Sequence, residues 1–435
     1  MSRISLAFLV TLSACSSETP QPPPASVASV ASVAPAVEDG AAALVAVTGT
    51  TPIDAEIKSH QAAVQQLPTR AESWVRLAEA WVKKARNAQT ERLYGRAEAA
   101  ARRALVLAPG DVGARRVLAL VFQNAHRFKE MRALATEMTR EAPRNADAWG
   151  LLCDAHLELG QYPEAEAACQ QMMDLAPGLP AWVRAAWLRW VSGDAEGALE
   201  LWREALQVVP VRDVEPRAWV LSEVGHLAWN RGQLDEAAAA YAAALALKPD
   251  HAPSLFGRGR LALARQDAAA AVADLRASAA ARPSEVTSYW LAAALRAAGQ
   301  AAEATALETA LAGAGDFDDP RSTALFLATH RRDPERAVAL ARRDFEARGD
   351  VFSEDALGFA LFRAGRLDEA AVHAERALRL QTPDPLLWAH AGLLARAQGR
   401  PAEARARLDK AFSLNPHFDP VLGPEVSGAL SGMPR

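Results

Sequence analysis

Residues 218–251 read AWVLSEVGHLAWNRGQLDEAAAAYAAALALKPDH, and this stretch decides the fold. It holds two apolar runs with helical spacing, which Gly232 separates and Pro249 ends. Glycine is favoured where a chain leaves a helix, and proline stops a helix because it lacks a backbone donor. Small residues at Gly225 and Ala237 would let the two helices approach closely. The stretch therefore predicts two antiparallel helices joined by a tight turn.

The same unit recurs along the chain. Prolines that follow apolar runs at nearly constant spacing are Pro109, Pro143, Pro177, Pro210, Pro249, Pro283, Pro383 and Pro416. The first five intervals are 34, 34, 33, 39 and 34 residues, and the last pair is 33 apart. Gly315-Asp316 and Gly349-Asp350 stand at the two intermediate turns expected between 283 and 383. A period of 34 indicates a helix-turn-helix repeat, whose core is buried between neighbouring units.

The residue types inside the unit resemble those of the tetratricopeptide repeat family. The matching residues of 218–251 are Leu221, Val224, Gly225, Ala228, Gly232, Leu234, Ala237, Tyr241, Ala244 and Pro249. The resemblance implies an all-α fold, a right-handed superhelical solenoid of about ten helix-turn-helix units over residues 53–419. The units would end near residues 109, 143, 177, 210, 249, 283, 316, 350, 383 and 416. One further helix, near Ile53 to Leu67, would precede them, and units seven and eight match the pattern poorly.

The N-terminus has a different character. A short positive start and an apolar run end in Leu12-Ser13-Ala14-Cys15, which resembles the lipobox of bacterial lipoproteins. The resemblance implies a signal peptide over 1–14, a diacylglyceride on Cys15 and a further acyl chain such as palmitate on its amino group. Ser16 resembles the residue that directs lipoproteins to the outer membrane of Gram-negative bacteria. An ordinary secretory signal with an incidental cysteine, or a mispredicted start, is the alternative.

The segments flanking the array are predicted to lack a fold of their own. Residues 15–52 are rich in Pro, Ala, Ser and Val, a composition typical of a tether. Residues 420–435 are short and irregular, and predict a C-terminal tail.

Several classes of function are disfavoured. The chain carries 48 Lys and Arg against 52 Asp and Glu, which gives a formal charge of −4 and argues against a nucleic-acid partner. It contains no GxxxxGK, HExxH or GxSxG pattern, so we predict no enzyme and no cofactor. Cys153, His156 and Cys169 do not have the spacing of a zinc site, and we predict no metal.

The first helix of each unit lines the inner surface in this family, and aromatic and basic residues gather there in units four to seven. This predicted groove consists of Arg184, Trp187, Trp190, Trp219, His226, Trp229, Asn230, Phe256, Arg260, Tyr289, Trp290 and Arg296. Clustered aromatics in a concave surface predict a binding site for a protein or peptide. The alternative is a tight superhelix in which these side chains pack between adjacent first helices.

Cys153 and Cys169 stand at positions 8 and 24 of one unit, almost opposite each other on its two helices. We expect a pair of buried free thiols, and the alternative is a disulfide, which an oxidising periplasm would allow.

These observations together predict a lipid-anchored outer-membrane protein whose solenoid faces the periplasm. We expect an interaction scaffold that serves envelope assembly or export and has a protein or peptide partner in the envelope. The alternative is an accessory protein for polysaccharide binding or export, with a sugar chain stacked on the tryptophans. The sequence leaves the partner, the pathway and the oligomeric state open.

Overall fold

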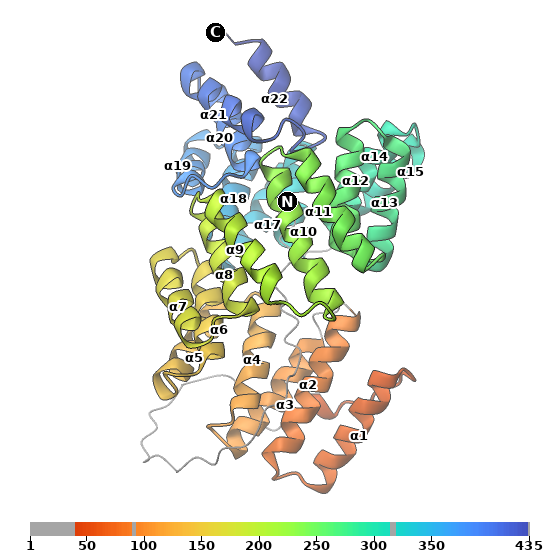
Figure 1. Cartoon of the computed structure of the whole chain (residues 1–435), viewed down its shortest axis with the longest axis vertical. Helices are drawn as coiled ribbons and strands as arrows, with labels where there is room; N and C mark the ends of the chain where they lie inside the picture. The colour runs from red at the N-terminus through yellow and green to blue at the C-terminus, as the bar shows by residue number, and fades with distance from the viewer. Residues whose placement is uncertain (1–39, 89–92, 314–318, 434–435) are drawn as a thin grey trace. The chain divides into compact units, whose positions relative to one another are not determined.

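The computed structural model describes residues 40–88, 93–313 and 319–433. Within them the chain is entirely helical, without a strand (Figure 1). The all-α solenoid that the sequence predicts is confirmed. The signal peptide, Cys15 and Gly315-Asp316 lie outside the described residues.

Most helices of the described residues pack as antiparallel pairs, with one helix before the pairs and one after them. In chain order the elements are η2 (Ala41–Leu44), α1 (Pro52–Gln66), α2 (Ala71–Ala88), α3 (Tyr94–Leu107), α4 (Val112–Asn124), α5 (Phe128–Glu141), α6 (Ala146–Glu158), α7 (Tyr162–Leu175), α8 (Leu179–Val191), α9 (Ala195–Val208), α10 (Val214–Asn230), α11 (Leu234–Leu247), α12 (Ala252–Ala264), α13 (Ala268–Ala281), α14 (Glu285–Ala297), α15 (Ala301–Ala312), α16 (Pro320–Thr329), α17 (Pro334–Ala347), α18 (Val351–Arg363), α19 (Leu367–Leu378), α20 (Pro385–Ala397), α21 (Pro401–Leu414) and α22 (Leu422–Ser431). The contacts give nine such pairs in these residues, α2/α3 and the eight from α6/α7 to α20/α21, which include the poorly matching units seven and eight (α14/α15 and α16/α17).

Local chemistry fixes where the helices begin and how closely they approach. The Asp111 carboxylate accepts the Ala114 N–H at 2.8 Å, and Asp350 does the same for Ser353 at 2.7 Å, so both cap a first helix. A Cβ at Gly225 would lie 2.4 Å from the Tyr241 ring, so glycine is required there. The repeat pattern therefore reflects helix capping and close helix packing.

The described residues form two compact units, 40–134 and 135–433. In the first, we predicted a tether up to residue 52, and the structure instead packs the chain from Gly40 onwards. The Ala43 carbonyl is buried and accepts the Gln61 side-chain amide at 2.9 Å and the Trp81 indole N–H at 3.0 Å. Two buried polar side chains thus find their partner in this segment.

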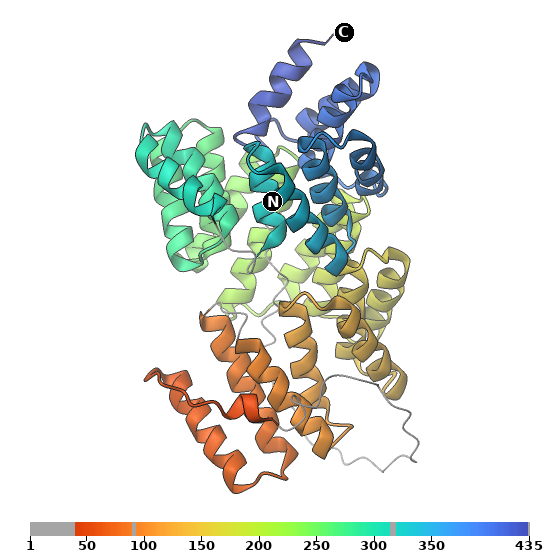
Figure 2. The same cartoon turned by 180° about the vertical axis from the view of Figure 1, so that it is seen from behind.

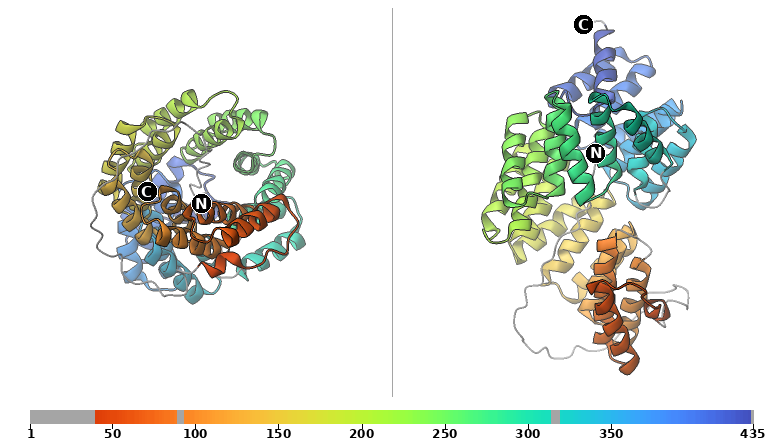
Figure 3. Two further views of the ribbon diagram at one scale, coloured as in Figure 1. Left: turned by 90° about the horizontal axis from the view of Figure 1, so that it is seen from below. Right: turned by 90° about the vertical axis from the view of Figure 1, so that its right-hand side faces the viewer.

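The second unit coils until its later helices lie beside its earlier ones. In Figures 1 and 2 the blue helices α18–α20 lie next to the yellow-green helices α6–α9. Seen along the axis, the helices from α6 to α15 follow an arc, and α18–α21 return to the side where α6 lies (Figure 3). Three successive helix pairs have their turns at residues 160, 193 and 232. In the same order, these turns contact the segment before α18, the segment before α20 and the segment after α21. We call this set of contacts the inter-turn seam.

Hydrogen bonds join the two sides of the inter-turn seam. The Val351 N–H donates to the Tyr162 hydroxyl at 3.0 Å, and the Asn415 amide donates to the Trp229 carbonyl at 2.8 Å. The Thr382 hydroxyl donates to the Val191 carbonyl between these two points. Since the bonded residues are 186 to 191 apart in sequence, one turn of the coil takes between five and six units.

Glycine makes the inter-turn seam possible. Gly160, Gly193 and Gly232 all have positive φ, between 68° and 93°, at the turn of their pair. A Cβ would lie 2.3 Å from the Gly349 carbonyl oxygen at Gly160, and 2.7 Å from that of Leu414 at Gly232. The backbones of the two turns therefore touch directly, with no room for a side chain.

The C-terminal segment is a helix where we predicted a tail. In α22, Leu422 and Val426 are buried, and Glu425 receives a bidentate ion pair from Arg363 and another contact from Arg331. This helix packs on α20 and α21.

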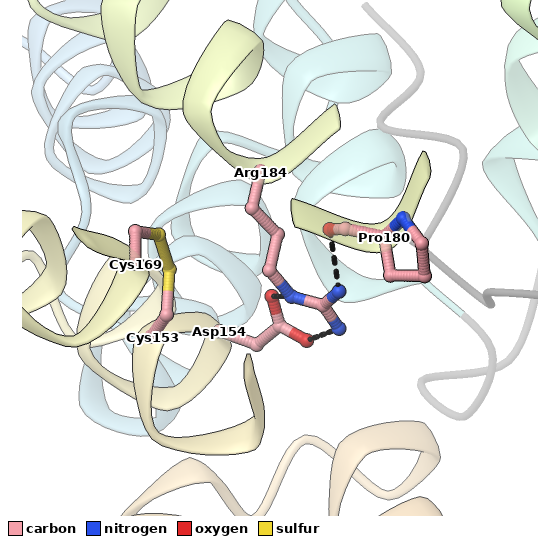
Figure 4. Close-up of a disulfide and its surroundings, with 5 residues drawn as sticks. All are labelled: Cys153, Asp154, Cys169, Pro180 and Arg184. Atoms are coloured by element: carbon pink, nitrogen blue, oxygen red, sulfur yellow. Dashed lines mark hydrogen bonds and ion pairs between the residues drawn. A yellow bond between two sulfur atoms is a disulfide. The ribbon is translucent and has the colours of Figure 1, made fainter. Parts of the chain in front are cut away.

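The structure joins Cys153 on α6 to Cys169 on α7 by a disulfide, with their Cα atoms 5.2 Å apart (Figure 4). Beside it the buried Arg184 forms a bidentate pair with Asp154, at 2.8 and 2.7 Å. The bond closes a short loop, because the cysteines are 16 residues apart.

We expect loss of this bond to lower the stability of the chain. Replacing both cysteines, as Cys153→Ala with Cys169→Ala, should cost about 2–3 kcal/mol, the entropy that a loop of this size removes from the unfolded chain. Urea unfolding with and without reductant measures it. The double variant is the control, since reductant should leave its midpoint unchanged. A wild-type midpoint that reductant does not move would show free thiols.

A methyl group at the inter-turn seam should separate the two turns. Gly160→Ala should cost about 1–2 kcal/mol for its left-handed backbone, and about 1–3 kcal/mol more for the collision with Gly349. Gly399→Ala is the matched control, since its φ of 71° is similar and no described atom lies within 4 Å of the added Cβ. Urea unfolding compares them, and equal losses would show that the seam does not form.

Candidate functional site

Most of the predicted groove is buried. Arg184, Trp190, Trp229, Phe256, Arg260 and Trp290 are each at most 7% exposed. This corrects the prediction of an open groove at these six positions, where the packing alternative applies. Trp187, Trp219, His226, Asn230 and Tyr289 are half-buried, and Arg296 is exposed.

The coil of the second unit explains part of this burial. Trp190 of α8 stacks on Phe352 of α18, with ring centroids 5.7 Å apart and planes 16° apart. Trp187 lies 4.8 Å from the Trp190 ring and 6.3 Å from Phe352. Rings that a single arc of helices would expose to solvent are thus covered by the next turn.

The rest of the aromatic cluster surrounds a buried cation. The Arg260 guanidinium lies 4.7 Å from the Trp229 ring centre and 4.5 Å from that of Phe256. It also donates to His226 Nδ1 at 3.2 Å. Burial lowers the pKa of His226 well below its ordinary value, so its ring is neutral and able to accept. Arg260 therefore holds the first helices of units five and six together by cation–π contact.

The second unit contains a hollow between α14 and α22, and we call it the α14–α22 cavity. Its volume is about 470 Å³, within the range of small-molecule and side-chain binding pockets. Its wall consists of Leu263, Ala264, Tyr289, Trp290, Ala292, Ala293, Arg296, Ala297, Glu308, His330, Phe412, Pro416, His417, Asp419, Pro420, Val421, Gly423, Pro424 and Ser427. The structure thus brings Tyr289, Trp290 and Arg296 of the predicted groove to one site. Sequence reasoning missed the other side, which α22 and its preceding segment supply.

The polar groups of the cavity are ordered by two contacts. Arg296 and Glu308 form a bidentate pair at 2.7 Å, which raises the pKa of the guanidinium and lowers that of the carboxylate. The Tyr289 hydroxyl donates to both oxygens of Asp419, at 2.9 and 3.0 Å. Burial and the negative charge of Asp419 raise the pKa of Tyr289 well above its ordinary value, so the hydroxyl stays a donor.

His330 completes the wall beside Tyr289. Its ring centre lies 5.9 Å from that of Tyr289 and 4.5 Å from that of Phe326. Burial lowers the pKa of His330, so the ring adds no positive charge at neutral pH. The cavity therefore offers aromatic walls with one neutral ion pair and one further carboxylate.

The described residues offer neither a metal site nor a membrane-spanning helix. Among the described residues, no cluster of His, Cys, Asp and Glu is large enough to hold a metal ion. Of the helices in those residues, none has the length and apolar character needed to cross a membrane.

Comparison with known proteins identifies repeats in three segments of the chain. Profiles described as tetratricopeptide repeat match residues 122–186, and residues 225–286 and 356–417. These segments include the whole of α5–α7, α11–α13 and α19–α21. No curated protein matches the chain.

Two solved structures show limited similarity. One is PilW, a widely conserved type IV pilus biogenesis factor, with 16% identity, a TM-score of 0.39 and coverage of 45% of this chain and 90% of that chain. The other is a human IFIT1 dimer with PPP-AAAA, with 14% identity, a TM-score of 0.36 and coverage of 66% and 72%.

The matched segments, the repeat period and the antiparallel helix pairs agree with one another, and such repeats support a role as a protein-interaction scaffold. The chain is therefore a protein that contains tetratricopeptide repeats.

Proposed function

We propose that this chain is a lipid-anchored scaffold of the bacterial envelope, which holds a protein partner at the α14–α22 cavity. The observation that carries the proposal is the cavity itself. Aromatic side chains such as Trp190 and Trp229 are buried against other side chains of the unit. By contrast, Tyr289, Trp290 and Phe412 border a hollow of about 470 Å³. A pocket with rigid aromatic walls and few polar groups suits an anchor side chain of a partner.

The envelope location is supported by two independent features. The first is the sequence that ends in Leu12-Ser13-Ala14-Cys15, with its resemblance to a lipobox. The second is the disulfide between Cys153 and Cys169, since such bonds persist in oxidising compartments such as the periplasm. We propose the outer membrane, with the solenoid on the periplasmic side, on the basis of Ser16.

The polysaccharide alternative has less support. Sugar rings stack on open aromatic faces, and Trp190 uses its face on Phe352 while Trp229 is fully buried.

Filling the cavity should abolish capture of the partner. Ala293→Trp places an indole in the hollow, and we expect the yield of a cross-linked envelope protein to fall about tenfold or more. Ala239→Trp on the exposed face of α11 is the matched control, because it adds the same side chain away from the cavity. Circular dichroism checks that both variants fold. Equal capture by wild type and Ala293→Trp would contradict the proposal.

Lipidation has a separate test. Cys15→Ser should remove the acyl chains, and the protein should move from the membrane fraction to the soluble periplasm, because stable anchoring needs at least two chains. Metabolic labelling with an alkyne fatty acid, followed by fractionation, measures both effects. A wild-type protein that takes up no label would contradict lipidation, and an unchanged fraction for Cys15→Ser would contradict anchoring through this residue.

A further inference from the structure

We infer that the α14–α22 cavity takes a cationic side chain, a lysine or an arginine, from the partner. This rests on the proposed function, because it names the group that the site would recognise. The argument concerns Asp419, a carboxylate in the wall of the cavity that is only 7% exposed.

Among the described residues, Asp419 has no cationic side chain bonded to it, whereas the other carboxylate of the cavity does. Arg296 is neutralised by Glu308, which also lies 3.6 Å from Arg332. No lysine, arginine or histidine of the described residues forms an ion pair with Asp419. A buried carboxylate is costly unless it is paired or fully hydrogen-bonded. The cavity therefore contains one negative charge that lacks a counter-charge.

The hydrogen bonds of Asp419 are unevenly shared between its two oxygens. Oδ1 accepts the backbone N–H groups of Val421 and Leu422, at 2.9 and 2.7 Å, and the Tyr289 hydroxyl. Oδ2 accepts only that same hydroxyl, at 3.0 Å. One hydroxyl has one proton, so Oδ2 has no donor of its own. Capping of α22 thus accounts for Oδ1, while Oδ2 has only a share of the Tyr289 hydroxyl among the described residues.

The surroundings of Oδ2 suit a cation better than a neutral donor. Tyr289 and Trp290 both line the cavity, and aromatic faces attract ammonium and guanidinium groups. Asp419 also lines a second, smaller hollow with Tyr289 and Phe326, so the carboxylate lies between two spaces rather than in a packed core. A long apolar stem with a charged end would contact the rings and place its head at Asp419.

The test compares two small amides that differ in charge but hardly in shape. N-acetyl-arginine amide and N-acetyl-citrulline amide are titrated into the full chain, with Trp fluorescence and saturation-transfer NMR as readouts. We expect the arginine amide to bind about tenfold or more tightly, the difference that a charge-assisted hydrogen bond supplies. This comparison needs no variant and does not depend on how a mutation affects folding.

Variants test whether Asp419 supplies the negative charge that selects the arginine amide. Asp419→Asn keeps the oxygen that accepts from Tyr289 and α22, and should lose the preference for arginine. Asp409→Asn, on the exposed side of α21, also removes one negative charge, and this variant should keep the preference for arginine. Ala293→Trp should abolish binding of both amides.

The outcomes separate this inference from the proposed function. Equal affinity for the two amides, no binding of the arginine amide, or an unchanged preference in Asp419→Asn would overturn the cationic ligand. If Ala293→Trp still loses the envelope partner in that case, the cavity is a protein-binding site of another chemistry. If Ala293→Trp keeps the partner, the proposed function itself fails.

Discussion

The second unit depends on direct backbone contact between successive turns of its coil. Gly160, Gly193 and Gly232 each lie against the backbone of a segment between 180 and 190 residues further on. Because no side chain lies between them, the turns approach as closely as their backbones allow at these points. A larger residue at any of the three would separate the turns and weaken the neighbouring hydrogen bonds from Val351 and Asn415.

This tight coil decides what the inner surface can do. An open arc of repeats would present Trp187 and Trp190 to a ligand, whereas the closed coil covers them with Phe352. Arg260 is also buried, at the contact between units five and six. Aromatic rings rather than a carboxylate surround its charge there. Dispersion, cation–π contact and area burial all favour this arrangement over exposure. The inner aromatics of this chain therefore stabilise the coil.

The repeat pairs could be predicted from the sequence because their causes are local. A proline or a capping residue, a turn glycine and a small residue at a helix contact recur within 34 residues and specify one pair. The coil could not be predicted in this way, since Trp190 and Phe352 belong to different units and no short period relates them. The missed helix α22 has a local signal, Asp419 before an apolar run, but Gly423, Pro424 and Gly428 obscured it. Proline is tolerated there because it stands in the first turn of the helix.

The candidate site lies where α22 departs from the rule that governs the repeats. Within a pair, a small residue admits the partner helix, as at Gly392, where a Cβ would lie 2.6 Å from Leu408. The glycine at 428 in α22 has no described atom within 4 Å of its Cβ position, so no helix packs closely on that side. Three prolines, Pro416, Pro420 and Pro424, also border the hollow. α22 packs on α20 and α21, and the cavity lies between α22 and α14. Side chains of the unit do not fill this space. The hollow that we propose as a binding site therefore lies beside one helix that covers the array without joining the repeat.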